Sequence, residues 1–307
     1  MKTAIETKNL TVVYRGKWGI QKQAVSDLSI KVSEGAIFGF IGHNGAGKTT
    51  TIKILTGLCR ATSGDAEIMG TSVKNVIARN KIGFLPENPY FYEYLTAEES
   101  LTFYARLHGI ERKEIAKRVD KLLDGVGLAK AKKTAVRGFS KGMKQRLGLA
   151  QAMVHNPDVY ILDEPLSGLD PVGRREVREK IIELKKNGST IFFTSHVLAD
   201  VEMLCDEVAL VSQGKLVSFG KIDDLINREV ISIDIHGEGF DKNSLEKLQK
   251  ISTHLVHKDN ITFVTVNNEK KAQEVKDILE KCGGTLRAMI PHRENLEDFY
   301  IRNSRGV

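Results

Sequence analysis

The sequence predicts an α/β protein, with a main domain built on a largely parallel sheet and a small α+β domain after it. Strand-like and helix-like segments alternate through about residue 220, which is the pattern of a sheet with crossover helices. Residues 36–42, AIFGFIG, are an apolar run ending in glycine, as in a strand buried on both faces. From about residue 223 the order of segments changes. We therefore place the domains at 1–222 and 223–307.

The main domain's expected elements follow from apolar spacing and from helix start and stop signals. We expect strands at residues 9–14, 24–32, 36–42, 81–87, 159–163 and 190–195, and a closing hairpin at 208–220. We expect helices from about Lys48, from about Thr96 to Lys133, from near Ser140 and over 174–187. The Ser140 hydroxyl is suited to cap its helix. The helix-rich block at about 88–138 predicts an inserted helical subdomain.

In the second domain, short strands and helices alternate in an order typical of a ferredoxin-like α+β unit. The expected strands are 231–237, 253–258, 260–268 and 285–291, and the expected helices are 243–251, 272–282 and 296–303. The strand at 253–258 rests on the weakest pattern of these.

Composition narrows the class of protein. The chain has 307 residues, 41% of them hydrophobic, which is enough for a sizeable core. It contains no apolar run long enough to span a bilayer, and its N-terminus lacks the apolar core of a signal peptide, so we expect a cytoplasmic protein. Three scattered cysteines without a CxxC pair argue against a disulfide framework or a zinc site.

The net charge of +7 is compatible with a nucleic-acid or anionic-membrane partner. The densest basic stretch, Arg112 to Arg146, has no interleaved aromatic residues, which weakens a single-strand-binding interpretation. A solvated helical face explains it more simply, so no nucleic-acid partner is expected.

Residues 42–50, GHNGAGKTT, fit the phosphate-binding pattern G-x-x-x-x-G-K-[ST], with a strand before and a helix after. Glycines let the backbone curl with its N–H groups inward, and the helix brings its positive end to the same place. Lys48 would supply a charge to the β- and γ-phosphates, and Thr49 a hydroxyl to Mg²⁺. The residues expected to bind ATP here are Gly42, Asn44, Gly45, Ala46, Gly47, Lys48, Thr49 and Thr50.

Acidic residues end the apolar run VYILD at 159–163. Asp163 would hold Mg²⁺ and its water shell, as an aspartate on a strand near the P-loop does in many P-loop proteins. Glu164 would orient an attacking water as general base. Salt-bridged surface acids are the alternative interpretation.

Further motifs follow the P-loop along the chain. Together and in their order they resemble those of the nucleotide-binding domain of ATP-binding cassette (ABC) proteins, over roughly the first 70% of the chain. FSKGMKQR at 139–146 resembles the family's signature, VYILDEP its Walker B strand with the catalytic glutamate, and SGLD at 167–170 its D-loop. His196 in FTSHVLAD resembles the switch histidine. Tyr14 matches the aromatic residue that stacks on adenine, although a tyrosine at a strand end is also commonly a core residue; Trp18 is a lesser candidate for that role.

The resemblance implies a head-to-tail pair of cassettes with two ATP molecules between them, formed by two copies or with a different cassette chain. Ser140 and Gly142 would clasp the γ-phosphate bound by the partner's P-loop. His196 would contact the γ-phosphate and act in catalysis with Glu164 and Lys48. Asp170 would shape the water site and the neighbouring subunit's site. Taken alone, FSKGMKQR is equally compatible with a plain N-capped helix whose Gln145 and Arg146 lie on its surface.

Two positions depart from the family pattern. In FLPEN, Glu87 stands where the family usually has glutamine; it would offer an oxygen to Mg²⁺ or its water, together with Thr49 and Asp163, but it adds a charge. The signature reads SKG where SGG is more usual, so Lys141 could make a contact at the subunit interface.

The resemblance therefore predicts an Mg²⁺- and ATP-dependent ATPase subunit of a transporter, similar to bacterial exporter ATPases with a small C-terminal domain. Separate transmembrane permease subunits would be driven through the helical block after Glu87 and would hold the chain on the cytoplasmic face of the membrane. The alternative is a soluble ABC ATPase acting on ribosomes or nucleic acid. A P-loop small-molecule kinase would leave the signature and Glu164 without roles.

Overall fold

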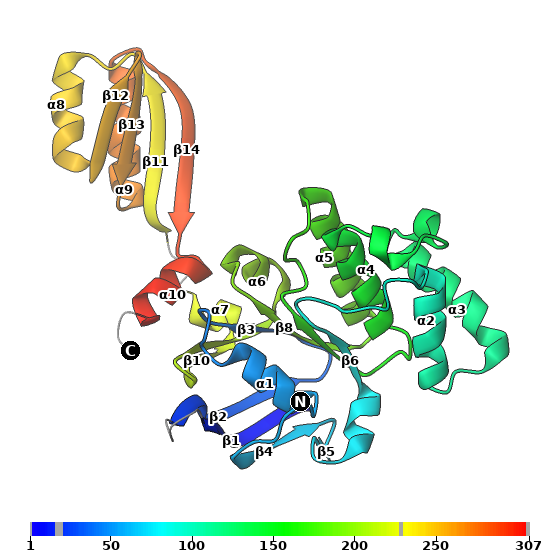
Figure 1. Ribbon diagram of the computed structural model, residues 1–307. Coiled ribbons are helices and arrows are strands. Elements are labelled where there is room, and N and C mark those ends of the chain that lie inside the picture. Colours follow the sequence, from blue (N-terminus) through cyan, green and yellow to red (C-terminus); the bar gives the residue numbers. More distant parts are fainter. Residues whose placement is uncertain (1, 16–20, 227–229, 305–307) are drawn as a thin grey trace. The chain divides into compact units, whose positions relative to one another are not determined.

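The computed structural model describes residues 2–15, 21–226 and 230–304, in which the chain forms two units (Figure 1). Among the described residues, the first unit comprises those up to Ile222 together with Asn303 and Ser304, and the second unit is Asp223–Arg302. Among the described residues, no helix is both long and apolar enough to cross a membrane.

The first unit is organised around a six-stranded sheet in the order β10-β9-β3-β8-β7-β6. Its strands are β3 (Ile37–Ile41), β6 (Ile82–Leu85), β7 (Val159–Asp163), β8 (Thr190–Ser195), β9 (Glu207–Ser212) and β10 (Lys215–Lys221). All neighbours pair in parallel except β10, which forms an antiparallel hairpin with β9. Every residue of β3, β7 and β8 is buried. The predicted parallel sheet and its closing hairpin are confirmed.

A second sheet, wholly antiparallel, has the order β2-β1-β4-β5. Its strands are β1 (Thr3–Arg15), β2 (Gln21–Ser33), β4 (Ser63–Ile68) and β5 (Thr71–Ser72). The first two were expected as strands, but β4 and β5 were not. Residues 63–68, SGDAEI, carry too few apolar side chains for period-2 reasoning to detect, and pairing with β1 supplies what the local sequence lacks.

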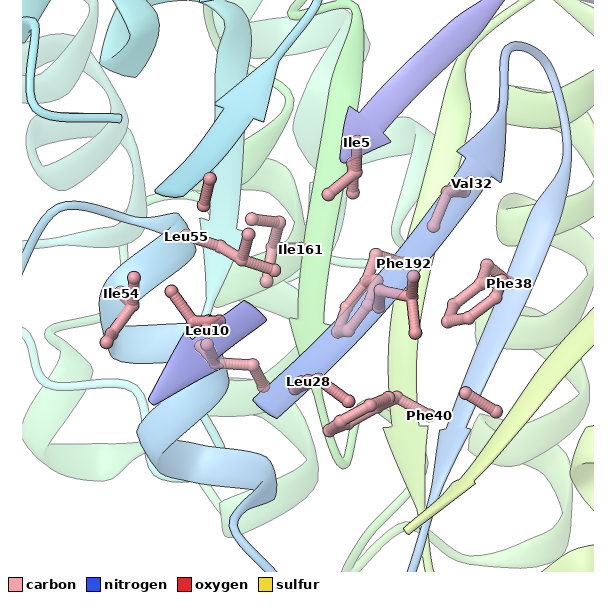
Figure 2. Packing of buried hydrophobic residues seen from close by; sticks show 14 of the residues in the cluster. Ile5, Leu10, Leu28, Val32, Phe38, Phe40, Ile54, Leu55, Ile161 and Phe192 are labelled. Atoms are coloured by element: carbon pink, nitrogen blue, oxygen red, sulfur yellow. The ribbon is translucent and has the colours of Figure 1, made fainter. Parts of the chain in front are cut away.

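The main core lies between these sheets and helix α1 (Lys48–Leu55), as Figure 2 shows. Alternate apolar residues of β1 and β2, such as Leu10 and Leu28, point into it because successive strand residues face opposite sides of a sheet. Phe38 and Phe192 from neighbouring strands stack with ring centroids 5.4 Å apart. This core fixes the carboxyl end of β3, from which the glycine-rich loop leaves.

The inserted block contains α2 (Ala97–Leu107) and α3 (Arg112–Gly125), which pack with α4 (Lys141–Ala152) around one buried cluster. The prediction of a single helical stretch from Thr96 to Lys133 is wrong. The chain turns at Gly109, whose φ of +71° is a left-handed conformation that ends a helix, and short 3₁₀ turns follow α3.

The remaining helices of the first unit flank the parallel sheet. They are α5 (Pro171–Lys186) and α6 (Leu198–Leu204), and 3₁₀ turns lie at Val76–Lys81, Ala129–Ala131 and Val136–Gly138; α7 (Ile222–Leu225) begins where this unit ends. Helix α5 starts three residues before the predicted position, because Asp170 caps it and Pro171 occupies its first turn. Helix α6 was not predicted.

The second unit follows the order β-α-β-β-α-β, with a final helix. Its elements are β11 (Val230–Glu238), α8 (Lys242–Ile251), β12 (His254–Lys258), β13 (Ile261–Val266), α9 (Glu269–Lys281), β14 (Thr285–Arg293) and α10 (Leu296–Ser304). The antiparallel sheet has the order β12-β13-β11-β14, the ferredoxin-like arrangement. Its own core includes Ile233, Val264 and Val275.

Candidate ATP-binding and hydrolysis site

The glycine-rich loop lies between β3 and α1, where parallel strands end and a helix begins. Gly45 and Gly47 have φ values of +84° and +102°, conformations that side chains disfavour. A Cβ at Gly47 would lie 2.5 Å from the backbone oxygen of Ala24, so only glycine fits there. Around Gly45 there is open space, which leaves room for a ligand against the loop. Such a loop at a helix N-terminus is suited to phosphate.

Lys48 is 8% exposed and forms the first residue of α1. Its Nζ donates hydrogen bonds to the backbone oxygens of Gly42, at 2.5 Å, and of His43, at 3.3 Å. Burial lowers the pKa of Lys48, whereas Glu164, Asp163 and Glu87, in that order, act to raise it. Three predicted carboxylates therefore lie close enough to the amine to act on its charge.

Asp163 ends β7 and is 5% exposed. Burial raises its pKa most, and a hydrogen bond from Thr194 works against that rise. Thr194 Oγ1 donates to Asp163 Oδ1 at 2.6 Å and accepts from the Glu164 N–H at 3.0 Å. Thr194 thus holds both carboxylate residues, yet sequence reasoning missed it. The only signal was a polar residue inside the apolar run TIFFTS.

Glu164 and His196 meet although they are 32 residues apart: His196 Nδ1 is 2.8 Å from Glu164 Oε2. Glu164 has a φ of +49°, so the chain turns sharply directly after β7. The glutamate side chain is 10% exposed and the histidine 60%, so the pair has one shielded and one open end. A carboxylate oriented by a histidine can hold a water and accept its proton.

The signature segment forms the N-terminus of α4. Ser140 accepts a hydrogen bond from the Met143 N–H at 3.2 Å, which confirms the predicted cap. Gln145 is 1% exposed, so it is not the surface residue of a plain capped helix. Its Nε2 donates to the backbone oxygens of Glu164, at 3.5 Å, and Pro165, at 3.4 Å. The signature helix therefore contacts the backbone that carries Glu164.

Residues 167–170 lie against the signature within the same chain. Asp170 Oδ1 accepts from the Gly173 N–H at 2.8 Å and caps α5. A Cβ at Gly142 would lie 3.2 Å from Leu169 Cδ2. Gly168 has a φ of +71°, and a Cβ there would meet the Lys141 side chain at 2.7 Å. Ser140, Gly142 and Asp170 are thus on adjoining elements.

The residues present fit Mg²⁺ and ATP. The Thr49 side chain is exposed, and within the described residues its hydroxyl makes no hydrogen bond. No group of three or more histidine, cysteine, aspartate or glutamate side chains there could hold a metal alone. Mg²⁺ suits such a site, because it commonly combines one or two carboxylates with phosphate oxygens and waters.

Tyr14 is 42% exposed near the end of β1, and its hydroxyl lies 3.8 Å from Cys59 Sγ. Trp18, its competitor for the adenine, lies outside the described residues. The glycine loop, buried lysine and strand-end aspartate together define a P-loop nucleotide-binding protein.

Comparison with known proteins gives the family. Residues 25–167 match the family model described as ABC transporter. The chain is 40% identical over 306 residues to an uncharacterized ABC transporter ATP-binding protein of Synechocystis sp., covering 98% of this chain and 84% of that relative. It is 39% identical over 308 residues to the bacitracin transport ATP-binding protein BcrA of Bacillus licheniformis, covering 98% and 97%. The chain belongs to the ABC transporter family, as an ATP-binding subunit.

Solved structures agree with that fold. The ATP-binding subunit of an ABC transporter superimposes with a TM-score of 0.67 at 33% identity, covering 73% of this chain and 92% of that chain. A dimeric cassette in a post-hydrolysis state with ADP and Pi gives 0.66 at 22% identity, covering 71% and 98%. ABC cassettes are ATPases, so this chain is an ATP-hydrolysing subunit.

Proposed function

We propose that the chain is the ATPase of an exporter and drives separate transmembrane permease subunits. The observation that carries this proposal is the similarity to bacitracin transport ATP-binding proteins, which extends over both units of the chain. Through the permease the chain would be held at the cytoplasmic face of the membrane.

Within one chain, we assign phosphate binding to the glycine-rich loop. We assign ATP hydrolysis to the residues that directly follow β7 and β8, namely Glu164 and His196. The loop N–H groups and Lys48 would hold the phosphates, while Thr49, Asp163 and Glu87 would hold Mg²⁺ or its waters. Bound Mg²⁺ would offset phosphate charge in hydrolysis. Glu164 orients the water and takes its proton, and His196 fixes that carboxylate at 2.8 Å. Tyr14 would stack on the adenine.

Two cassettes would act together. The chain carries one P-loop and one signature, and the related cassette solved with ADP and Pi is a dimer. Ser140 and Gly142 at the N-terminus of α4 would bind the γ-phosphate held by the partner, with Asp170 beside them. Both faces of each ATP would then be covered only in the closed pair.

The permease would dock beside the loop that carries Glu87. A cavity of about 350 Å³ lies beside that loop. Its lining includes Pro89, Tyr90, Tyr104 and His108. Tyr90 is 82% exposed. Four more large hydrophobic side chains are exposed in the following residues and on α2: Tyr92, Tyr94, Phe103 and Leu107. A cytoplasmic segment of a membrane protein would bury this surface and sense movement of Glu87.

The test is a tagged pull-down from detergent-solubilised native membranes, with mass spectrometry of the proteins that co-purify. We expect a polytopic membrane protein in stoichiometric amount. Tyr90→Glu should abolish its recovery, whereas Leu58→Glu, at a residue 66% exposed in the segment after α1, should not. Recovery of ribosomal or nucleic-acid-binding proteins without a membrane protein would overturn the proposal.

A further inference from the structure

A second cavity, of about 210 Å³, brings together the two positions at which this sequence departs from the family pattern. Its lining comes from the loop after β6 and from the signature segment: Glu87, Asn88, Pro89, Phe139, Lys141, Lys144 and Gln145. By the resemblance given above, glutamine is expected at position 87 and glycine at position 141. One change adds a negative charge to this cavity and the other adds a positive charge.

The charge on Glu87 reaches the phosphate site. It acts to raise the pKa of both Lys48 and Asp163, so the carboxylate lies within electrostatic range of the buried lysine and the buried aspartate. Glu164 adds a third acid around a single lysine. A bound triphosphate would increase this excess of negative charge further. A glutamine at position 87, being neutral, would not contribute to the excess.

Lys141 lines the same cavity as Glu87. Its stem lies on Gly168 of the SGLD turn, where an added Cβ would be 2.7 Å from both Cδ and Cε and 3.0 Å from Nζ. Lys144, the other cation of the cavity, already forms an ion pair with Glu93 at 3.2 Å. Within the described residues, neither Lys141 nor Glu87 forms an ion pair with any other side chain.

We propose that Lys141 is a positioning residue for ATP hydrolysis and that it acts by pairing electrostatically with Glu87 across this cavity. The pair offsets the charge that Glu87 brings to the phosphate site and ties the loop after β6 to the signature helix. Both side chains are exposed in the single chain, where solvent weakens the pair. A partner cassette or nucleotide that covers the cavity would strengthen it. The inference rests on ATP hydrolysis and not on what is transported.

A double-mutant cycle tests the pair, with Glu87→Gln, Lys141→Met and both together in the full-length chain. Methionine keeps the stem that packs on Gly168 and removes only the charge. We expect Lys141→Met to lower kcat/KM for ATP about fivefold, the size of one partly shielded charge pair. Adding Glu87→Gln should restore most of that loss, because the charge that needed offsetting is gone. Lys141→Arg should keep the parent's activity.

A second readout is the affinity for a fluorescent ATP analogue in EDTA, which needs neither Mg²⁺ nor turnover. Lys141→Met should weaken this binding, and Glu87→Gln should again restore it. Lys144→Met is the matched control: its effect should be the same in the parent and in the Glu87→Gln background, because Glu93 is its partner. Thermal unfolding checks each variant, and Lys141→Gln is a second neutral substitution.

If the losses from Lys141→Met and Glu87→Gln multiply in the double variant, in hydrolysis and in Mg²⁺-free binding alike, the two side chains act independently and the proposal is wrong. A parent chain that neither binds nor hydrolyses ATP would instead contradict its assignment as an ATPase. The two failures are therefore distinguishable.

Discussion

At the scale of single residues, Thr194 determines how the two acids of the site are held. It is fully buried in β8, donates to the Asp163 carboxylate and accepts from the Glu164 N–H. A carboxylate buried beside a strand end needs such a donor, because burial penalises its charged form. The hydroxyl thus keeps Asp163 ionised at lower pH than burial alone would allow.

We predict that Thr194→Val, which keeps the shape but removes the hydroxyl, lowers the free energy of unfolding by about 1 to 3 kcal/mol. It also removes the interaction that lowers the pKa of Asp163, so that carboxyl stays protonated to higher pH. In the pH profile of kcat/KM for ATP, the fall in activity at low pH (the acid limb) should therefore move to higher pH. Urea unfolding and a pH–rate profile measure the two effects.

Thr190→Val is the matched control for this prediction. Thr190 lies in the same strand, is 2% exposed and accepts from the Gly35 N–H at 2.9 Å, away from the acids. It should lose comparable stability with no shift of the acid limb. An unshifted limb in Thr194→Val would show that Thr194 does not tune Asp163.

At the scale of elements, helix α5 and helix α6 are joined by a buried acid. Asp200 of α6 has a side chain only 6% exposed; its carboxylate lies 2.5 Å from Arg174 Nη2 and 3.6 Å from Arg178 Nη1 of α5. Helix α5 follows the SGLD turn, and α6 begins two residues after His196. The network therefore fixes the helix after the histidine against the helix after Asp170.

We predict that Asp200→Asn destabilises the chain by about 2 kcal/mol, since two arginines lose a shielded partner but keep some contact with water. Loosening α6 should also displace His196, so kcat should fall severalfold with little change in ATP affinity. Thermal unfolding and steady-state kinetics measure this. Glu179→Gln, which breaks only the exposed pair with Arg175 on α5, should leave both quantities unchanged. Equal effects of the two substitutions would contradict a role for the Asp200 network.

At the scale of the whole molecule, the proposed mechanism makes hydrolysis and assembly depend on the same carboxylate, that of Glu164. If Glu164 positions the water, removing its charge stops turnover without removing any group that binds phosphate. ATP would then stay bound between two cassettes, and the closed pair would persist. Oligomeric state is therefore a direct readout of the role of Glu164.

We predict that Glu164→Gln keeps ATP affinity within about twofold, loses at least about a hundredfold in kcat and forms a stable dimer with ATP. Size-exclusion chromatography with and without ATP, beside an ATPase assay, measures this. Glu183→Gln, an exposed acid on α5 paired with Lys180, should behave as the parent. Hydrolysis at the parent's rate would show that Glu164 is not the base.

The parts of the site that are contiguous in sequence were predictable. The glycine loop needs a fixed spacing of glycines, a lysine and a threonine, and that spacing is read directly from residues 42–50. The strand ending at Asp163 and the cap at Ser140 have equally local causes, an apolar run and a hydroxyl before a helix. Short segments whose own side chains decide their conformation can be assigned without knowing their neighbours.

By itself, then, the sequence determined the class of fold, the phosphate loop, the strand ends and the signature cap, because each depends on neighbours in the chain. Only the tertiary structure decided that Thr194 holds Asp163, that Gln145 supports the backbone of Glu164 and that Lys141 shares a cavity with Glu87. The residues of each pair lie 19 to 54 positions apart in the sequence. Strands β4 and β5 were missed because pairing with neighbouring strands overrides weak local preferences.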